Sequence, residues 1–305
     1  MQIVLKTVEV KAQERIQAKA GGAIQAVQDF KMLVKFRLTL TVVFSSLMGF
    51  LIAHPGGLDF AALGVLALGG FLVTGAANAL NQVLEKDYDK LMQRTANRPV
   101  AAGRMRPADA VLIAGIMSLI GITLLALFNP WTAFLGMVAL ILYAFVYTPL
   151  KRVGPIAVVV GAFPGALPTL IGAAAAEGRL SALGLSLFAI QFFWQFPHFW
   201  SIGWLGHEDY TKAGYRLLPG GVRDRQTGLQ AFLYAIPLLG LGLVPFLTGI
   251  SGPISAVVIF GLSCLYAYLG WGLYRFDSRK AALQLMFFSF FYIPGALIAI
   301  WVDKI

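Results

Sequence analysis

The stretch Thr74–Arg106, TGAANALNQVLEKDYDKLMQRTANRPVAAGRMR, begins inside an apolar run and ends in a basic loop. Helical spacing places five of its polar side chains on one face: Thr74, Asn78, Asn81, Glu85 and Asp89. Polar and ionisable groups at membrane depth are costly, and their presence by default indicates a functional site. This face therefore predicts chemistry at the end of a membrane helix.

Basic residues follow these acids at once: Lys86, Lys90, Arg94, Arg98, Arg104 and Arg106. Carboxylates one helical turn apart can share one Mg²⁺, and arginine and lysine bind phosphate. The combination is typical of a site for a diphosphate–Mg²⁺ ligand. The alternative is a solvated helix end whose acids pair with neighbouring lysines, but the two asparagines on the same membrane face favour the site.

The composition is that of a membrane protein. The 305 residues are 58% hydrophobic and 12% charged, whereas a soluble domain carries about 25% charged residues. One cysteine excludes an intramolecular disulfide and a cysteine-based metal site. Apolar runs near the ~20 residues that cross a bilayer predict an all-α, polytopic fold with nine spans, at 36–53, 59–81, 109–128, 131–148, 156–176, 181–203, 228–249, 253–275 and 283–302.

The basic residues predict the orientation of these spans. All 24 lysines and arginines except Arg179 and Lys304 fall on one side, which the positive-inside rule assigns to the cytoplasm. The N terminus is then cytoplasmic and the C terminus lies outside. Because topology explains the net charge of +10, nucleic-acid binding has no independent support.

Residues 1–35 are expected to form a cytoplasmic tail, with an interfacial helix at 23–35, ahead of one membrane domain over 36–305. The tail has no apolar run, so it is not a secretory signal peptide. It contains acids and no serine, which is not typical of a mitochondrial transit peptide. We therefore expect a bacterial inner membrane rather than a mitochondrial one.

The fourth span ends in Tyr147, Lys151 and Arg152. These residues could clamp a diphosphate, with the tyrosine phenol near the reacting carbons. A positive-inside anchor with an interfacial aromatic residue is the alternative.

The sixth span carries Gln191, Gln195 and His198 at i, i+4 and i+7, which share a face beside Trp194. They predict the lining of a pocket for a flat aromatic or metal-bearing substrate, which His198 could contact or ligate. A single histidine that packs in the interior is the alternative.

The loop 207–225 is expected to lie opposite the first acidic motif. Glu208 and Asp209 could supply a second metal site, and Lys212, Arg216 and Arg223 could close over phosphate. The alternative is an ordinary cytoplasmic loop. Small residues in the Gly-rich segment 161–178 are expected to let helices approach closely.

The order of these motifs resembles the intramembrane UbiA-type prenyltransferases over about residues 30–300. Within that superfamily, the segments Trp194–Phe199 and Asp209–Gly214 most resemble the heme-farnesylating branch, the protoheme IX farnesyltransferases. There are three departures from the pattern, one of which is Ala157 at a place where the family often has asparagine. Glu85 stands where aspartate is commonest in the first acidic motif, and the second acidic motif is reduced to Asp209, with Ala213 four residues later.

The resemblance implies nine helices around a central cavity. It also implies transfer of the farnesyl group of farnesyl diphosphate to a vinyl group of heme b, giving heme O and diphosphate, in the lipid bilayer. Catalytic residues would be Asn81, Glu85, Asp89, Tyr147 and Asp209, of which all except the tyrosine would hold Mg²⁺. Diphosphate would be bound by Arg94, Arg98, Lys151, Arg152 and Lys212. Heme would lie against Gln191, Trp194, Gln195 and His198, and heme A synthase or a terminal oxidase under assembly would receive the product.

Three other interpretations remain open. A UbiA-type transferase could act on a quinone precursor or chlorophyllide, although Gln195 and His198 suit a porphyrin better than a small benzoate. A transporter would also place polar groups in broken helices, but here the charges gather at one face. A structural membrane subunit would not need the Asn–Glu–Asp face. Release of diphosphate that depends on an acceptor would separate an enzyme from a transporter.

Overall fold

The computed structural model describes residues 22–305, and these are almost entirely helical. Residues 22–33 form a helix, in agreement with the helix expected at 23–35. Two short helices lie in loops, α4 (Lys86–Asp89) and α10 (His207–Lys212). The long elements are α2 (Phe36–Ala53), α3 (Phe60–Leu84), α5 (Pro107–Ala126), α6 (Pro130–Ile141) with the π-helix η1 (Leu142–Tyr147) and α7 (Thr148–Leu150), α8 (Ile156–Glu177), α9 (Ala182–Leu205), α11 (Arg225–Ala235) with α12 (Pro237–Leu241) and α13 (Val244–Leu247), α14 (Pro253–Phe276) and α15 (Arg279–Val302).

Eight of these rods are long and apolar enough to cross a membrane. The ninth, α9, is of similar length but is not among these eight, and it carries two glutamines, a histidine and a proline. Residues 22–305 thus contain nine long helical segments, in approximate agreement with the nine predicted spans, and their boundaries agree to about one helical turn. The division into a tail of residues 1–35 and one membrane domain stays a prediction, and residues 1–21 lie outside the described part.

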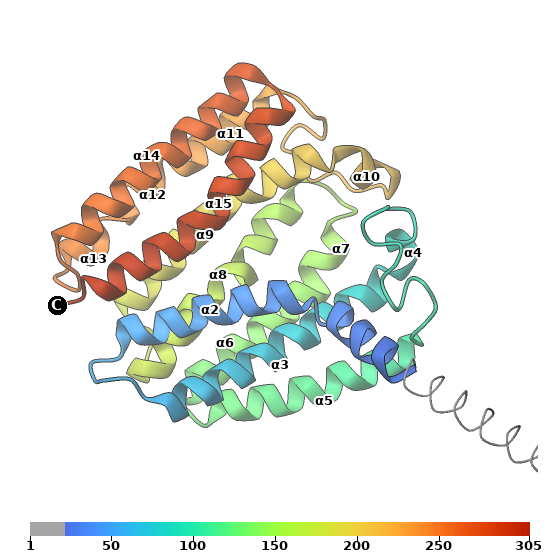
Figure 1. Cartoon of the computed structure of the whole chain (residues 1–305), viewed down its shortest axis with the longest axis horizontal. Helices are drawn as coiled ribbons and strands as arrows, with labels where there is room; N and C mark the ends of the chain where they lie inside the picture. Colours follow the sequence, from blue (N-terminus) through green and yellow to red (C-terminus); the bar gives the residue numbers. More distant parts are fainter. Residues whose placement is uncertain (1–21) are drawn as a thin grey trace, which may run out of the picture.

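The helices alternate in direction, so the connections sort into two ends (Figure 1). One end carries the two longest connections, 85–106 and 206–224, together with the short connection 151–155, and we call it the loop end. The other carries the turns 54–59, 127–129, 178–181 and 248–252 together with the C terminus. Figure 1 shows α4, α7 and α10 at the loop end and the C terminus beside α13 at the other. The predicted polar motifs thus gather at the loop end.

Large apolar side chains cover the outside of the bundle as well as its interior. About 70% of the surface is exposed at each of four apolar residues, Leu119, Leu247, Val257 and Phe291. So wide an apolar surface would be costly in contact with water. A lipid surround resolves this, because the bilayer core is itself apolar. The chain is therefore a multi-pass membrane protein.

Glycines let α2 and α8 approach to backbone contact. A Cβ atom placed on Gly172 would lie 1.9 Å from the carbonyl oxygen of Ser46, and one on Gly49 would lie 2.3 Å from that of Thr169. Two turns before Gly172 on α8, a Cβ on Gly165 would lie 1.9 Å from Oε1 of Gln195. The prediction that the small residues of 161–178 permit close approach is confirmed.

Replacing Gly172 with alanine should lower the free energy of unfolding by about 1–3 kcal/mol, because α2 and α8 must separate to admit the methyl group. Gly115 is the matched control, since a Cβ there meets nothing within 4 Å. Alanine at position 115 should be neutral or slightly stabilising, since glycine inside a helix costs up to about 1 kcal/mol. Thermal unfolding in detergent measures both variants, and equal midpoints would contradict the close packing.

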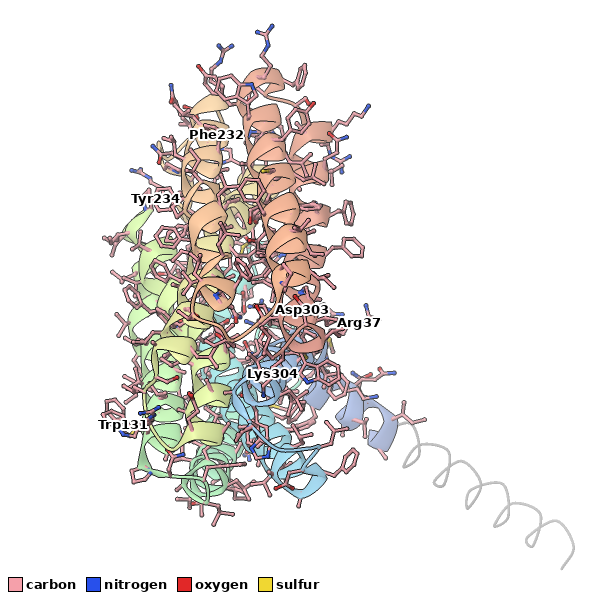
Figure 2. The ribbon with its side chains drawn as sticks, turned by 90° about the vertical axis from the view of Figure 1, so that its left-hand side faces the viewer. Arg37, Trp131, Phe232, Tyr234, Asp303 and Lys304 are labelled. Atoms are coloured by element: carbon pink, nitrogen blue, oxygen red, sulfur yellow. The ribbon has the colours of Figure 1, made fainter. Side chains whose placement is uncertain are left out.

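The C terminus ties three helices together at the end opposite the loop end. The carboxylate of Asp303 accepts a hydrogen bond from the backbone N–H of Ser255 in the first turn of α14, at 2.7 Å. The ammonium group of Lys304 donates to the carbonyl of His54, which follows α2. Figure 2 shows Asp303 and Lys304 near one another where α15 ends. This contact keeps α2, α14 and α15 in register.

Candidate active site

Two buried carboxylates mark the point where α3 ends. Glu85 caps the C terminus of α3, and Asp89 ends the short helix α4 one turn later. Glu85 is 2% exposed and Asp89 is fully buried. The predicted acidic motif is thus a compact interior pair rather than a solvated helix end.

Each carboxylate has a cationic partner from another part of the chain. The ammonium group of Lys151 donates to Oε1 of Glu85 at 2.7 Å. The guanidinium group of Arg98 donates to both carboxylate oxygens of Asp89 at 2.7 Å and lies 3.9 Å from Glu85. Burial raises the pKa of Glu85, but the charges of Lys151, Lys35 and Arg98 together outweigh burial and hold that pKa below its ordinary value. Glu85 is therefore ionised at neutral pH.

Asn81 is held from two sides one turn before Glu85. Its amide nitrogen donates to the hydroxyl of Thr148 at 3.0 Å, and its amide oxygen accepts from the ammonium group of Lys35 at 2.8 Å. Asn78 is tied to the residues before α2, because its amide nitrogen donates to the carbonyl of Val34 at 3.3 Å. The predicted Asn–Glu–Asp face is therefore continuous and buried.

Lys35 is a site residue that sequence reasoning missed, because it was counted only among the basic residues of the tail. It adopts a left-handed conformation, with φ 47°, between the helix 22–33 and α2. This bend directs its ammonium group to Asn81 and to the hydroxyl of Tyr143, at 3.3 Å. Burial lowers the pKa of Lys35 well below its ordinary value. Strained backbone of this kind tends to occur at functional sites.

Replacing Lys35 with methionine should raise the KM for a diphosphate substrate about tenfold, since one charge-assisted contact near the acidic pair is lost. Arg37 is the control, because it lies two residues away with an exposed side chain. Its methionine variant should keep the KM of the parent protein. Initial rates at varied substrate concentration decide the matter, and equal KM values for both variants would remove Lys35 from the site.

Three of the predicted cations lie over tyrosine rings at the loop end. Lys151 is 4.6 Å from the centroid of the Tyr147 ring, and Arg152 is 4.0 Å from that of Tyr88. Arg94 donates to the hydroxyl of Tyr210 at 3.3 Å. The aromatic faces hold these side chains beside the acidic pair while leaving N–H groups available for an anion.

Asp209 and Lys212 form a separate pair in α10. Their charged groups lie 3.7 Å apart and both side chains are partly exposed. Residues 22–305 contain no group of three or more histidine, cysteine, aspartate or glutamate side chains placed to hold a metal ion. Glu85 and Asp89 still fit Mg²⁺, which takes one or two carboxylates and fills its other positions with phosphate oxygens and water.

The predicted polar residues of α9 divide between two neighbouring helices. Gln191 and Gln195 are buried against α8, where their amide nitrogens donate at 3.0 Å to the carbonyls of Gly165 and Ala162. The amide oxygen of Gln191 has no hydrogen-bond partner in the described part of the chain. A buried acceptor without a partner is costly, so this oxygen is suited to meet a substrate.

Trp194 and His198 face α15 instead, and their rings stack with centroids 4.8 Å apart. The hydroxyl of Ser289 donates to the carbonyl of Met286 at 2.5 Å and lies 2.7 Å from Nδ1 of His198. When that hydroxyl gives its one proton to Met286, Nδ1 of His198 is the protonated ring nitrogen and donates to the hydroxyl. The lone pair of Nε2 is then available to a ligand or a hydrogen-bond donor.

The fold and this site together define an intramembrane helical bundle with paired carboxylates and cations at one end. The profile of the UbiA prenyltransferase family matches residues 42–292, and the chain belongs to this family. A protoheme IX farnesyltransferase of Flavobacterium johnsoniae is 46% identical over 285 residues, covering 90% of this chain and 94% of that protein. One of Cytophaga hutchinsonii is 44% identical, covering 91% and 98%.

Solved structures share the fold at low sequence identity. A digeranylgeranylglyceryl phosphate synthase has a TM-score of 0.77 at 17% identity and covers 91% of this chain and 98% of its own. A UbiA homolog from Archaeoglobus fulgidus bound to GPP and Mg²⁺ has a TM-score of 0.70 at 14% identity and covers 89% and 99%. The nine-helix UbiA-type architecture expected from the motifs is confirmed.

Proposed function

We propose that this prenyltransferase moves the farnesyl group of farnesyl diphosphate to a vinyl group of heme b, giving heme O and diphosphate. The observation that carries the proposal is the buried pair Glu85–Asp89 with its partners Lys151 and Arg98. The relatives named protoheme IX farnesyltransferase supply the acceptor, because they match this chain over most of its length.

The cationic partners are placed to exchange one anion for another. Without substrate, Lys151 and Arg98 neutralise the buried carboxylates. Bound Mg²⁺ would lie on Asn81, Glu85 and Asp89 and neutralise diphosphate charge. The two cations then turn to the diphosphate oxygens, with Lys35 beside them, and stabilise the charge that develops on the leaving group.

The second acidic loop would complete the diphosphate end. Asp209 from α10 is proposed as a further ligand to the metal, and Lys212 as a further diphosphate contact. Arg94 and Arg152, held over tyrosine rings, would bind the outer phosphate oxygens. All of these groups occupy the loop end of the bundle.

The reaction breaks the C1–O bond of farnesyl diphosphate and forms a C–C bond to the vinyl group. The allylic cation lies among apolar and aromatic side chains, where the Tyr147 ring stabilises positive charge and stray water is excluded. The vinyl π electrons attack C1, and the cation left beside the porphyrin ring takes hydroxide from water as a proton leaves. The product carries a hydroxyethylfarnesyl group.

The acceptor would lie along α9. Gln191 offers an amide oxygen without a partner, Gln195 lies one turn further along, and His198 offers Nε2. Trp194 stacks on His198 and holds its ring in place. These groups can position a flat macrocycle and contact its metal or its edge.

We also propose the bacterial inner membrane as the location, with the loop end in the cytoplasm. Figure 1 places that end opposite the C terminus, so the C terminus would lie outside. The product would pass to an enzyme that handles heme in the same bilayer, such as heme A synthase or a terminal oxidase under assembly.

The test is an acceptor panel with the purified protein, farnesyl diphosphate and Mg²⁺. Each reaction contains one acceptor, which is heme b, a quinone precursor or chlorophyllide, and the amount of diphosphate released is measured. Release should depend on heme b and exceed release with the other acceptors at least tenfold. Release that depends on the quinone precursor would keep the family and replace the acceptor, and no release with any acceptor would contradict an enzymatic role.

A further inference from the structure

The π-helix η1 ends beside α3 in a buried threonine that has no part in the proposed reaction. The backbone N–H of this residue, Thr148, donates to the carbonyl of Tyr143 five residues earlier, as a π-turn requires. Its side-chain hydroxyl donates to the same carbonyl at 2.8 Å. Thr148 is fully buried. Because π-turns are rare and frequently occur at functional sites, this threonine is a candidate for a role in the site.

The hydroxyl of Thr148 fixes which way the amide of Asn81 points. Its single proton goes to the carbonyl of Tyr143, so its lone pairs are left to accept a hydrogen bond. The amide nitrogen of Asn81 donates to them at 3.0 Å. At the other end of the amide, the oxygen accepts from the ammonium group of Lys35, which can only donate. Both partners therefore require the same orientation, with the amide nitrogen toward Thr148 and the amide oxygen away from it.

The amide oxygen of Asn81 is the atom that Mg²⁺ would take, because magnesium binds oxygen ligands. Lys35 donates to this oxygen in the structure, so the ammonium group must release it before the metal can bind there. Thr148 is then the one hydrogen-bond partner that the amide keeps within residues 22–305. Without this partner the amide would be free to rotate and to present its nitrogen to the metal.

We infer that Thr148 is a positioning residue that acts on the metal through Asn81. Its hydroxyl keeps the amide oxygen of Asn81 directed toward the metal while Lys35 moves to the diphosphate. This role rests on the proposed function and deepens it, because it adds a support behind the first residue of the Asn–Glu–Asp face. Partners of this kind orient metal ligands, and their loss typically lowers metal affinity by about 10- to 100-fold.

Three variants separate the hydroxyl of Thr148 from its shape. Thr148→Val removes the hydroxyl and keeps the branched side chain, whereas Thr148→Ser keeps the hydroxyl and removes the methyl group. Thr169→Val is the matched control. Thr169 is also fully buried, and its hydroxyl donates at 3.1 Å to the carbonyl of Ala166 in its own helix, α8. Both valine variants thus lose a buried hydroxyl, but only one of them loses a contact with Asn81.

The test measures metal binding directly, with Mn²⁺ as the probe because it prefers the same oxygen ligands as Mg²⁺. Mn²⁺ is titrated into each full-length protein in detergent, with farnesyl diphosphate and no acceptor. Its electron paramagnetic resonance is read against a blank without protein. Thr148→Val should raise the Kd for Mn²⁺ about tenfold. Thr148→Ser and Thr169→Val should stay within about twofold of the parent, and thermal unfolding shows that each variant is folded.

Three results would overturn the inference. Equal Mn²⁺ affinity in the parent and Thr148→Val would remove the hydroxyl from the metal site. An equal loss in Thr148→Ser would assign the effect to the methyl group, and an equal loss in Thr169→Val would assign it to a general weakening of the bundle. Failure of the proposed function shows differently. Mn²⁺ affinity would then fall in Thr148→Val alone, while the parent released no diphosphate with any acceptor.

Discussion

Replacing Asp89 with asparagine should lower the turnover of farnesyl transfer by about 10²–10³-fold, the usual effect of removing one electrostatic contact from an active site. The side chain is fully buried, and both of its oxygens are within 2.7 Å of Arg98. Asparagine keeps the shape but removes the charge that holds Mg²⁺. The guanidinium group is then left short of a counter-ion in the buried site, where such a loss is felt most.

Asp87 is the control for this variant. It lies two residues away in the same short helix, is exposed, and pairs with Lys90 at 3.1 Å. Its asparagine variant loses the same charge from the same loop but should keep turnover within about twofold, because a surface ion pair contributes little. Turnover and thermal unfolding of both variants are measured together. An Asp89→Asn protein that keeps parental turnover would place the metal elsewhere.

Replacing Lys151 with methionine should reduce turnover about 100-fold and raise the KM for farnesyl diphosphate. The ammonium group neutralises Glu85 at 2.7 Å in the structure, and the proposed mechanism moves it to the leaving group. Methionine fills similar space and supplies neither role. A rise in KM together with a fall in kcat distinguishes this double role from simple binding, which would alter KM alone.

Lys90→Met is the matched control for Lys151→Met, since Lys90 is exposed and its partner is the surface carboxylate of Asp87. It should leave both kinetic constants within about twofold of the parent values. Arginine at position 151 should bring KM part of the way back to the parental value and kcat less far. The planar guanidinium group can bind the diphosphate, but unlike the compact ammonium group it cannot shift easily from Glu85 to the leaving group. A Lys151→Met protein that resembles Lys90→Met would remove this residue from the mechanism.

The spans were predictable because the length of each apolar run matches the thickness of a bilayer and the basic loops between the runs follow the positive-inside rule. The helix α9 is the informative case. It carries two glutamines and a histidine and is not among the eight most apolar segments, yet its length and its place between two turns indicated a span. The sequence predicted that helices approach closely in the segment that contains Gly172, but not that this glycine meets the carbonyl of Ser46, because sequence does not reveal which backbone atoms a small residue faces.

The acidic motif was predictable, but its charge partners were not. Helical spacing put Asn81, Glu85 and Asp89 on one face, and the structure keeps them together. The contacts of Lys35 with Asn81 and of Lys151 with Glu85 join residues far apart in the chain. Local sequence patterns do not predict contacts of this kind. The sequence likewise placed the polar residues of α9 on one shared face, because helical spacing cannot show which neighbouring helix each side chain contacts.

Chromatography of the heme pigment is the most direct test of the account. Purified protein in detergent is incubated with heme b, farnesyl diphosphate and Mg²⁺. The heme pigment is then separated by chromatography, and its mass is measured by mass spectrometry. We expect a heme that has gained one farnesyl group and the elements of water with the parent protein, and unchanged heme with Asp89→Asn. Heme recovered unchanged from the parent, with a prenylated quinone precursor formed in a parallel reaction, would contradict it.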